Sequence, residues 1–293
     1  MLELKNITKT FGSFKALDDL TMTVPKGSVY GLVGPNGAGK STAIRHALGV
    51  YRPDSGTVLM DGQPVYENPE IKARINSIPD DIFYFASANL EDMHRYYRGI
   101  YPTFDDTLFV RLYEVFRLPY NIPIRRFSKG MQKQAAFHLS ICTRPDMLIL
   151  DEPVDGLDPV MRRQVWSLIL SDVAQRGTTV LISSHNLREL EDICDHVGIM
   201  QKGKMLLERS LADMQGATHK VQLVGDIPEG LQVLNASASG RLRTLVVRGS
   251  VAEVDARLRQ ANLAYYDILP LSLEEIFIYE LGGVNYAVKD MVL

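Results

Sequence analysis

The segment from Gly34 to Thr42 constrains this chain more than any other, because it matches the pattern G-x-x-x-x-G-K-[ST]. That pattern is typical of a phosphate-binding loop. The apolar residues 28–33 predict a buried strand before the loop, and Lys40–Leu48 predicts a helix after it that Gly49 can end. A glycine-rich loop at a helix N-terminus surrounds an anion with backbone N–H groups. The segment therefore predicts a nucleotide-binding α/β fold of the P-loop class.

Two side chains of the loop have chemistry suited to a nucleotide. Lys40 can neutralise the outer phosphates, and the Ser41 hydroxyl can ligate Mg²⁺. The predicted cofactors are ATP and Mg²⁺. The residues predicted to contact the nucleotide in this loop are Gly34, Pro35, Asn36, Gly37, Ala38, Gly39, Lys40, Ser41 and Thr42.

Length and charge bound the class of protein. The chain has 293 residues and a net charge of −3, which favours two domains and argues against a nucleic-acid partner. Cys142 and Cys194 stand apart from any Cys/His cluster, so buried, reduced thiols are expected rather than a metal site. The sequence shows no signal-like N-terminus and no run of about 18 apolar residues, so no membrane span is expected.

The order of strand and helix patterns divides the chain. Residues 1–217 form the predicted nucleotide-binding domain, with a mostly parallel core sheet and a helical insert at about 86–145. Residues 218–293 form a predicted small α+β domain with a tail, including a short helix at Leu273–Leu281. The strands and helices expected between the insert and this second domain are Met147–Leu150, Pro159–Ala174, Thr179–Ser183, Asn186–Cys194, Val197–Met200 and Met205–Leu207.

An apolar strand at residues 147–150 ends in two carboxylates, Asp151 and Glu152. Successive side chains of a strand point to opposite faces, so only one of the two faces the P-loop directly. Asp151 is predicted to ligate Mg²⁺. Glu152 is predicted to act as the base that orients the attacking water.

Four further segments resemble motifs of the ABC-type ATPase subunits. Residues 127–131 resemble the signature Leu-Ser-Gly-Gly-Gln, and residues 154–159 resemble the D-loop. His185 resembles the switch histidine that follows the next strand, and Phe11 resembles the aromatic that stacks on adenine, with Phe14 as a competing candidate. The resemblance covers about residues 1–215, and the motifs occur in the family's order.

The resemblance implies a two-lobed ATPase that closes head-to-tail on ATP. Ser128 and Gly130 of one subunit would contact the γ-phosphate held by the other, while His185 would steady that phosphate and Asp158 would approach the nucleotide. The implied partners are integral membrane transporter subunits and a second ATPase subunit, in a homodimer or a heterodimer. The implied location is cytoplasmic, peripheral on the inner face of the cell membrane.

Departures from the family pattern narrow the comparison. Asp80 stands where the Q-loop glutamine is expected, and its carboxylate can reach Mg²⁺ or water but lacks the donor of an amide. Lys129 and Met131 replace Gly and Gln in the signature. This form resembles bacterial exporter ATPases of the bacitracin-resistance and Ytr types, and residues 271–277 resemble their extra C-terminal domain.

Two alternative functions stay open from the sequence. One is a DNA-repair or translation ATPase without a membrane partner, although the single P-loop and the lack of sustained heptads argue against it. Another is a regulator that binds ATP without turnover, against which Glu152 and His185 argue.

The aromatic segment at residues 82–85 either receives a helix of a membrane subunit or packs the insert onto the core, with Tyr84 as the residue that tests this choice.

Overall fold

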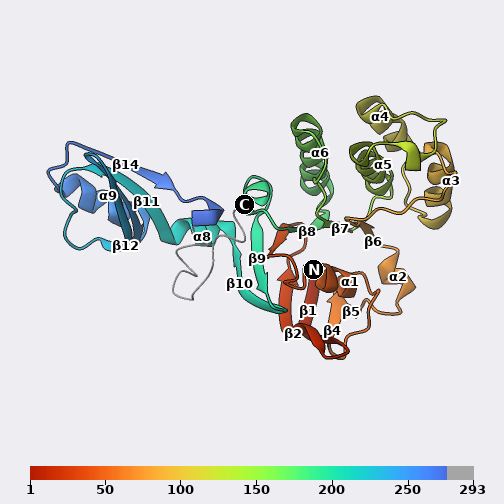
Figure 1. The fold of residues 1–293 in the computed structure, drawn as a ribbon, viewed down its shortest axis with the longest axis horizontal. Helices are drawn as coiled ribbons and strands as arrows, with labels where there is room; N and C mark the ends of the chain where they lie inside the picture. Colours follow the sequence, from red (N-terminus) through yellow and green to blue (C-terminus); the bar gives the residue numbers. More distant parts are fainter. Residues whose placement is uncertain (276–293) are drawn as a thin grey trace. The chain divides into compact units, whose positions relative to one another are not determined.

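The computed structural model describes residues 1–275 (Figure 1). The chain forms two compact units. One comprises residues 1–185 and 196–208, and the other comprises residues 186–195 and the segment from 209 onward. The domain boundary at 217–218 that the sequence suggests stays a prediction.

A six-stranded sheet forms the centre of the first unit, with the order β10-β9-β3-β8-β7-β6. Strand β3 pairs in parallel with β8 and β9, and β7 pairs in parallel with β6 and β8. All five residues of β3 are buried, as expected for a parallel strand covered on both faces. The strands are β3 (Val29–Val33), β6 (Ile75–Ile78), β7 (Met147–Asp151), β8 (Thr179–Ser184), β9 (His196–Gln201) and β10 (Lys204–Ser210).

A second, antiparallel sheet has the order β2-β1-β4-β5. Leu2 and Leu4 of β1 pair with Val24 and Met22 of β2, and this apolar face packs with the helix α1 in one core cluster. The mostly parallel core sheet was predicted correctly, whereas the antiparallel pairing of the N-terminal strands was not predicted. The elements are β1 (Leu2–Phe11), β2 (Phe14–Val24), α1 (Lys40–Ala47), β4 (Ser55–Met60), β5 (Gln63–Pro64) and α2 (Pro69–Lys72).

The helical insert consists of α3 (Leu90–Ile100), α4 (Asp106–Phe116), the short 3₁₀ helix η1 (Ile124–Arg126) and α5 (Lys129–Cys142), which gather in one region of Figure 1. The ring of Phe109 lies between the rings of His94 and His138, with centroids 4.1 and 4.3 Å away. Burial lowers the pKa of His138 to about 4, so this residue packs as a neutral ring.

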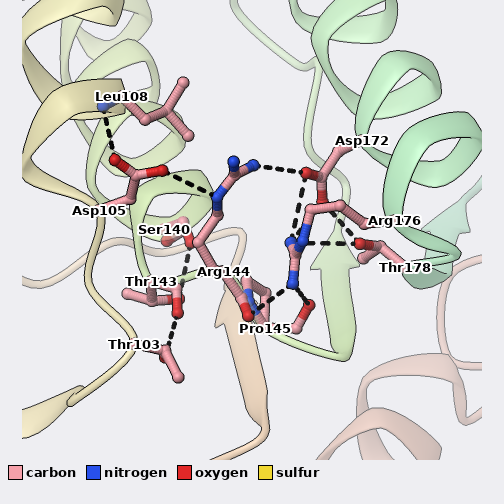
Figure 2. A network of polar contacts seen from close by, with 10 residues as sticks. All are labelled: Thr103, Asp105, Leu108, Ser140, Thr143, Arg144, Pro145, Asp172, Arg176 and Thr178. Atoms are coloured by element: carbon pink, nitrogen blue, oxygen red, sulfur yellow. Dashed lines mark hydrogen bonds and ion pairs between the residues drawn. The ribbon is translucent and has the colours of Figure 1, made fainter.

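An ion-pair network joins the insert to the core (Figure 2). Arg144, just after α5, donates to Asp105 at the start of α4 (3.1 Å) and to Asp172 of α6 (Pro159–Arg176) (3.0 Å). Asp172 also accepts from Arg176 (3.0 Å) and from the Thr178 hydroxyl (2.6 Å). The Asp172 carboxylate is therefore the shared acceptor of three donors.

The second unit contains an antiparallel sheet with the order β12-β13-β11-β14, and its core includes Val221, Leu245 and Leu258. Strand β12 was missed, because its residues are all exposed and mostly small or polar. The predicted helix Leu273–Leu281 and the motif at 271–277 extend outside the described residues. The elements are α7 (Leu187–Glu191), α8 (Leu211–Ala217), β11 (Thr218–Val224), β12 (Gln232–Ser239), β13 (Leu242–Arg248), α9 (Val251–Gln260) and β14 (Tyr265–Pro270).

Asp172→Ala is expected to destabilise the first unit. The Asp172 side chain is only 13% exposed, and its loss leaves Arg144 and Arg176 without their shared acceptor. Removing one partner of a partly buried ion pair is expected to lower the free energy of unfolding by about 1–3 kcal/mol. The melting temperature should fall by several degrees in a thermal scan. Lys15→Ala, which breaks an exposed ion pair, is the control and should change it little.

Candidate functional site

Glycine is required at three positions of the phosphate-binding loop. Gly37 and Gly39 have φ values of 79° and 106°, in the left-handed region. A Cβ on Gly34 would lie 2.4 Å from the carbonyl oxygen of Met200. The loop therefore has a shape that side chains at these positions would disrupt, and α1 begins directly after it at Lys40.

The Lys40 ammonium lies inside the loop. Its side chain is only 7% exposed, and Nζ donates to the carbonyl oxygen of Gly34 (2.7 Å). The same Nζ lies 3.7 Å from Oε1 of Glu152. The positive charge is thus held at the centre of the anion-binding loop, next to the carboxylate at the end of β7.

One pocket combines the loop with the ends of neighbouring strands. Since parallel strands end at the same edge of a sheet, Asp151 at the end of β7 and Glu152 directly after it lie beside the loop that follows β3. Asp80, which follows β6, lines the same pocket. The lining residues are Phe14, Ala16, Asn36, Gly37, Ala38, Gly39, Lys40, Ser41, Thr42, Asp80, Asp151 and Glu152.

The oxygen donors in this pocket fit a magnesium ion. Ser41 contributes a hydroxyl, and Asp151 and Asp80 contribute carboxylates, which are the ligands that Mg²⁺ prefers. The Ser183 hydroxyl of β8 donates a short hydrogen bond to Asp151, which fixes the orientation of that carboxylate. Ser183 was missed because nothing in a buried strand sequence shows which side chain its neighbour contacts.

Glu152 is held in an unusual backbone conformation. Its φ is 46°, its N–H donates to the carbonyl oxygen of Ser183 (3.2 Å), and its carboxylate accepts from His185 Nδ1 (2.9 Å). Burial raises the pKa of Glu152, while His185 and Lys40 oppose that rise. His185 is half exposed, so it can contact a ligand at the mouth of the site.

The signature and D-loop segments meet within the chain. Ser128 caps α5 by accepting the N–H of Met131 (3.2 Å), and Asp158 caps α6 by accepting two N–H groups. A Cβ on Gly130 would lie 2.9 Å from the carbonyl oxygen of Gly156, so the close approach requires glycine. The predicted nucleotide contacts of Ser128, Gly130 and Asp158 stay predictions.

The aromatic candidates for adenine stacking differ in position. Phe14 lines the pocket and is 62% exposed. Phe11 packs edge-on against Tyr51, with ring centroids 5.5 Å apart. Adenine stacking by Phe11 stays a prediction, and the pocket favours its competitor Phe14.

The aromatic segment after Asp80 is divided between core and surface. Tyr84 is buried and donates to the carbonyl oxygen of Gln132 (2.8 Å), so it is unsuitable as a probe of docking. Phe83 and Phe85 are exposed and contact each other edge to face. Of the two predicted roles for this segment, packing is therefore correct for Tyr84. The exposed surface is formed by its neighbours Phe83 and Phe85.

Sequence reasoning also missed Lys133 of α5, which is buried beside the site. Its Nζ donates to the carbonyl oxygen of Glu152 (2.6 Å). A lysine on a helix is ordinarily exposed, and only the packing of α5 against the end of β7 shows that this one is not.

Comparison with known proteins identifies the family. Residues 17–155 match the family model described as ABC transporter. The chain is 31% identical to the ABC transporter ATP-binding protein YtrB of Bacillus subtilis (strain 168), over 97% of this chain and 99% of that protein. The chain belongs to the ATP-binding proteins of ABC transporters. The family predicted from the P-loop, signature and D-loop segments is therefore confirmed.

Two other relatives and a solved structure are also ATP-binding proteins or subunits of transport systems. The chain is 35% identical to the bacitracin transport ATP-binding protein BcrA of Bacillus licheniformis, over 71% of this chain and 69% of that protein. It is 32% identical to the Nod factor export ATP-binding protein I of Sinorhizobium fredii (strain NBRC 101917 / NGR234), over 78% of this chain and 69% of that protein. A structure of the ATP-binding subunit of an ABC transporter superposes with a TM-score of 0.68 at 28% identity, covering 73% of this chain and 92% of that one.

The protein is thus an ATPase subunit of an ABC transporter, and ATP is its nucleotide. Within residues 1–275, no helix combines the length and apolar character that crossing a membrane requires.

Glu152→Gln is expected to reduce turnover by about 10²–10⁴-fold while ATP binding persists. The amide keeps the shape of the side chain and removes the charge that would accept a proton from water. Phosphate release and ATP affinity of the purified full chain measure the two effects. Near-normal phosphate release would reject Glu152 as the base.

Proposed function

We propose that this ATPase powers export through separate membrane subunits. The hydrolysis that would power it is supported by the pocket that brings Lys40, Ser41, Asp151 and Glu152 together at one sheet edge. The names of two relatives, which refer to bacitracin transport and Nod factor export, support export as the direction of transport. The same names favour a transporter over a repair, translation or regulatory ATPase.

Each residue of the pocket has a role in the proposed hydrolysis. Lys40 neutralises phosphate charge from inside the loop, and Ser41 and Asp151 would hold Mg²⁺, with Asp80 as a further oxygen donor. Bound there, Mg²⁺ would neutralise the charge that develops between the β- and γ-phosphates. Glu152 accepts a proton from the attacking water, and His185 donates a hydrogen bond to the γ-phosphate.

The proposed active unit is a head-to-tail dimer, with itself or a related ATPase. Ser128 and the N-terminus of α5 are exposed, so the signature of one subunit can close on ATP held by the other. ATP then stabilises the dimer, and hydrolysis releases it. This cycle supplies the motion that a membrane partner converts into transport.

Mixing two inactive variants tests the composite sites. Lys40→Ala removes the phosphate clamp and keeps the signature, whereas Ser128→Arg has the reverse defect. If sites form between subunits, the mixture contains dimers with one intact site, and partial phosphate release should reappear. Measurable release from either variant alone, with no gain on mixing, would place both halves in one chain.

The proposed membrane contact is the aromatic surface formed by Phe83, Phe85 and Tyr96. Their exposed fractions are 77%, 47% and 46%, and Phe85 contacts both neighbours edge to face. Large apolar side chains are typical anchors of protein interfaces. Docking there would hold the subunit on the inner face of the cell membrane.

Phe83→Ala is expected to weaken co-purification with the membrane subunits by about tenfold, without changing the melting temperature or the ATP affinity. An exposed anchor contributes to binding and little to folding. Val110→Ala, at a 63% exposed position of α4, is the matched control and should bind normally. Tyr84→Ala should instead lower the melting temperature. Full partner binding by Phe83→Ala would reject this surface.

A further inference from the structure

Two buried ammonium groups flank Glu152, and only one of them belongs to the P-loop. Lys40 lies 3.7 Å from its carboxylate, while Lys133 donates to its backbone carbonyl at 2.6 Å. The Lys133 side chain is only 7% exposed. Lys133 is absent from the lining of the nucleotide pocket and lines a neighbouring pocket, which shares Asp80 with it.

The peptide that Lys133 contacts is strained. Glu152 has a φ of 46°, which L-residues with long side chains rarely adopt. Pro153 follows it and further restricts its backbone. Such a conformation persists only when surrounding contacts hold it. In the described residues those contacts are the Ser183 carbonyl and hydroxyl on the N–H, and Lys133 on the C=O.

The second neighbour of Lys133 is the residue in place of the Q-loop glutamine. Asp80 Oδ1 lies 3.6 Å from Lys133 Nζ, and Asp80 is 62% exposed. An exposed partner at this distance supplies modest stabilisation, so the short bond to Glu152 is the stronger contact of the two. Lys133 nevertheless joins the signature helix α5 to Asp80 and to Glu152, which both line the nucleotide pocket.

We propose that Lys133 is a positioning residue for ATP hydrolysis, which holds the Glu152 peptide in its left-handed conformation so that the carboxylate faces the attacking water. The proposal rests on the proposed role of Glu152 as the base. It also gives α5 a direct mechanical link to catalysis, because a shift of the signature helix moves the donor that holds Glu152.

The test compares Lys133→Met, Lys133→Arg and Gln134→Met in the full-length chain. Methionine keeps the length of the side chain and removes its donors, so kcat should fall by about 10- to 100-fold while KM for ATP stays within about threefold. Arginine restores a charged donor and should retain at least tenfold more activity than methionine. Gln134 is the next residue of α5 and makes no hydrogen bond to Glu152 within the described residues, so Gln134→Met should keep the wild-type kcat.

Hydrogen exchange of the backbone gives a readout independent of turnover. Amides in the segment from Glu152 to Asp158 should exchange faster in Lys133→Met and not in Gln134→Met, at unchanged melting temperature. A kcat for Lys133→Met within twofold of wild type, or equal losses in the methionine and arginine variants, would overturn the proposal. If Glu152→Gln is inactive and Lys133→Met is normal, only this inference fails. If Glu152→Gln is active, the role of Glu152 itself fails.

Discussion

The parallel pairing of β3, β7 and β8 is the constraint on which the site depends. It places the P-loop, the two carboxylates at the end of β7 and His185 after β8 at one edge of the sheet. These three segments are far apart in sequence, and the parallel register brings them together. Apolar side chains of the antiparallel sheet and of α1 pack in one core cluster with Tyr30 and Leu32 of β3, and this burial stabilises the position of the strand.

The site concentrates charge in a partly buried space. Lys40 lies within the loop, Glu152 lies beside it, and Ser183 orients Asp151. Burial raises the pKa of Glu152, and the two neighbouring basic groups limit that rise. Contacts within the chain hold these donors and acceptors in defined positions.

The helical insert connects this chemistry to the rest of the molecule. Its helix α5 is capped by Ser128 of the signature and carries Lys133, which donates to Glu152. It ends shortly before Arg144, which pairs with Asp172 of α6 (Figure 2). The same helix therefore contributes the surface proposed to meet a second subunit and the donor proposed to hold the catalytic residue. The proposed role of Lys133 would couple a movement of the insert to the geometry of hydrolysis.

The sequence by itself determined the elements whose signals are local. The P-loop and the strand that ends at Asp151 follow from glycine conformation and from apolar runs. Tertiary structure alone decided what depends on packing between distant segments. It buried Tyr84 while exposing Phe83, brought Phe14 rather than Phe11 into the pocket, and placed the Lys133 ammonium against Glu152. A linear pattern cannot specify these outcomes, because the burial of a side chain and its partners depend on which distant surface packs against it.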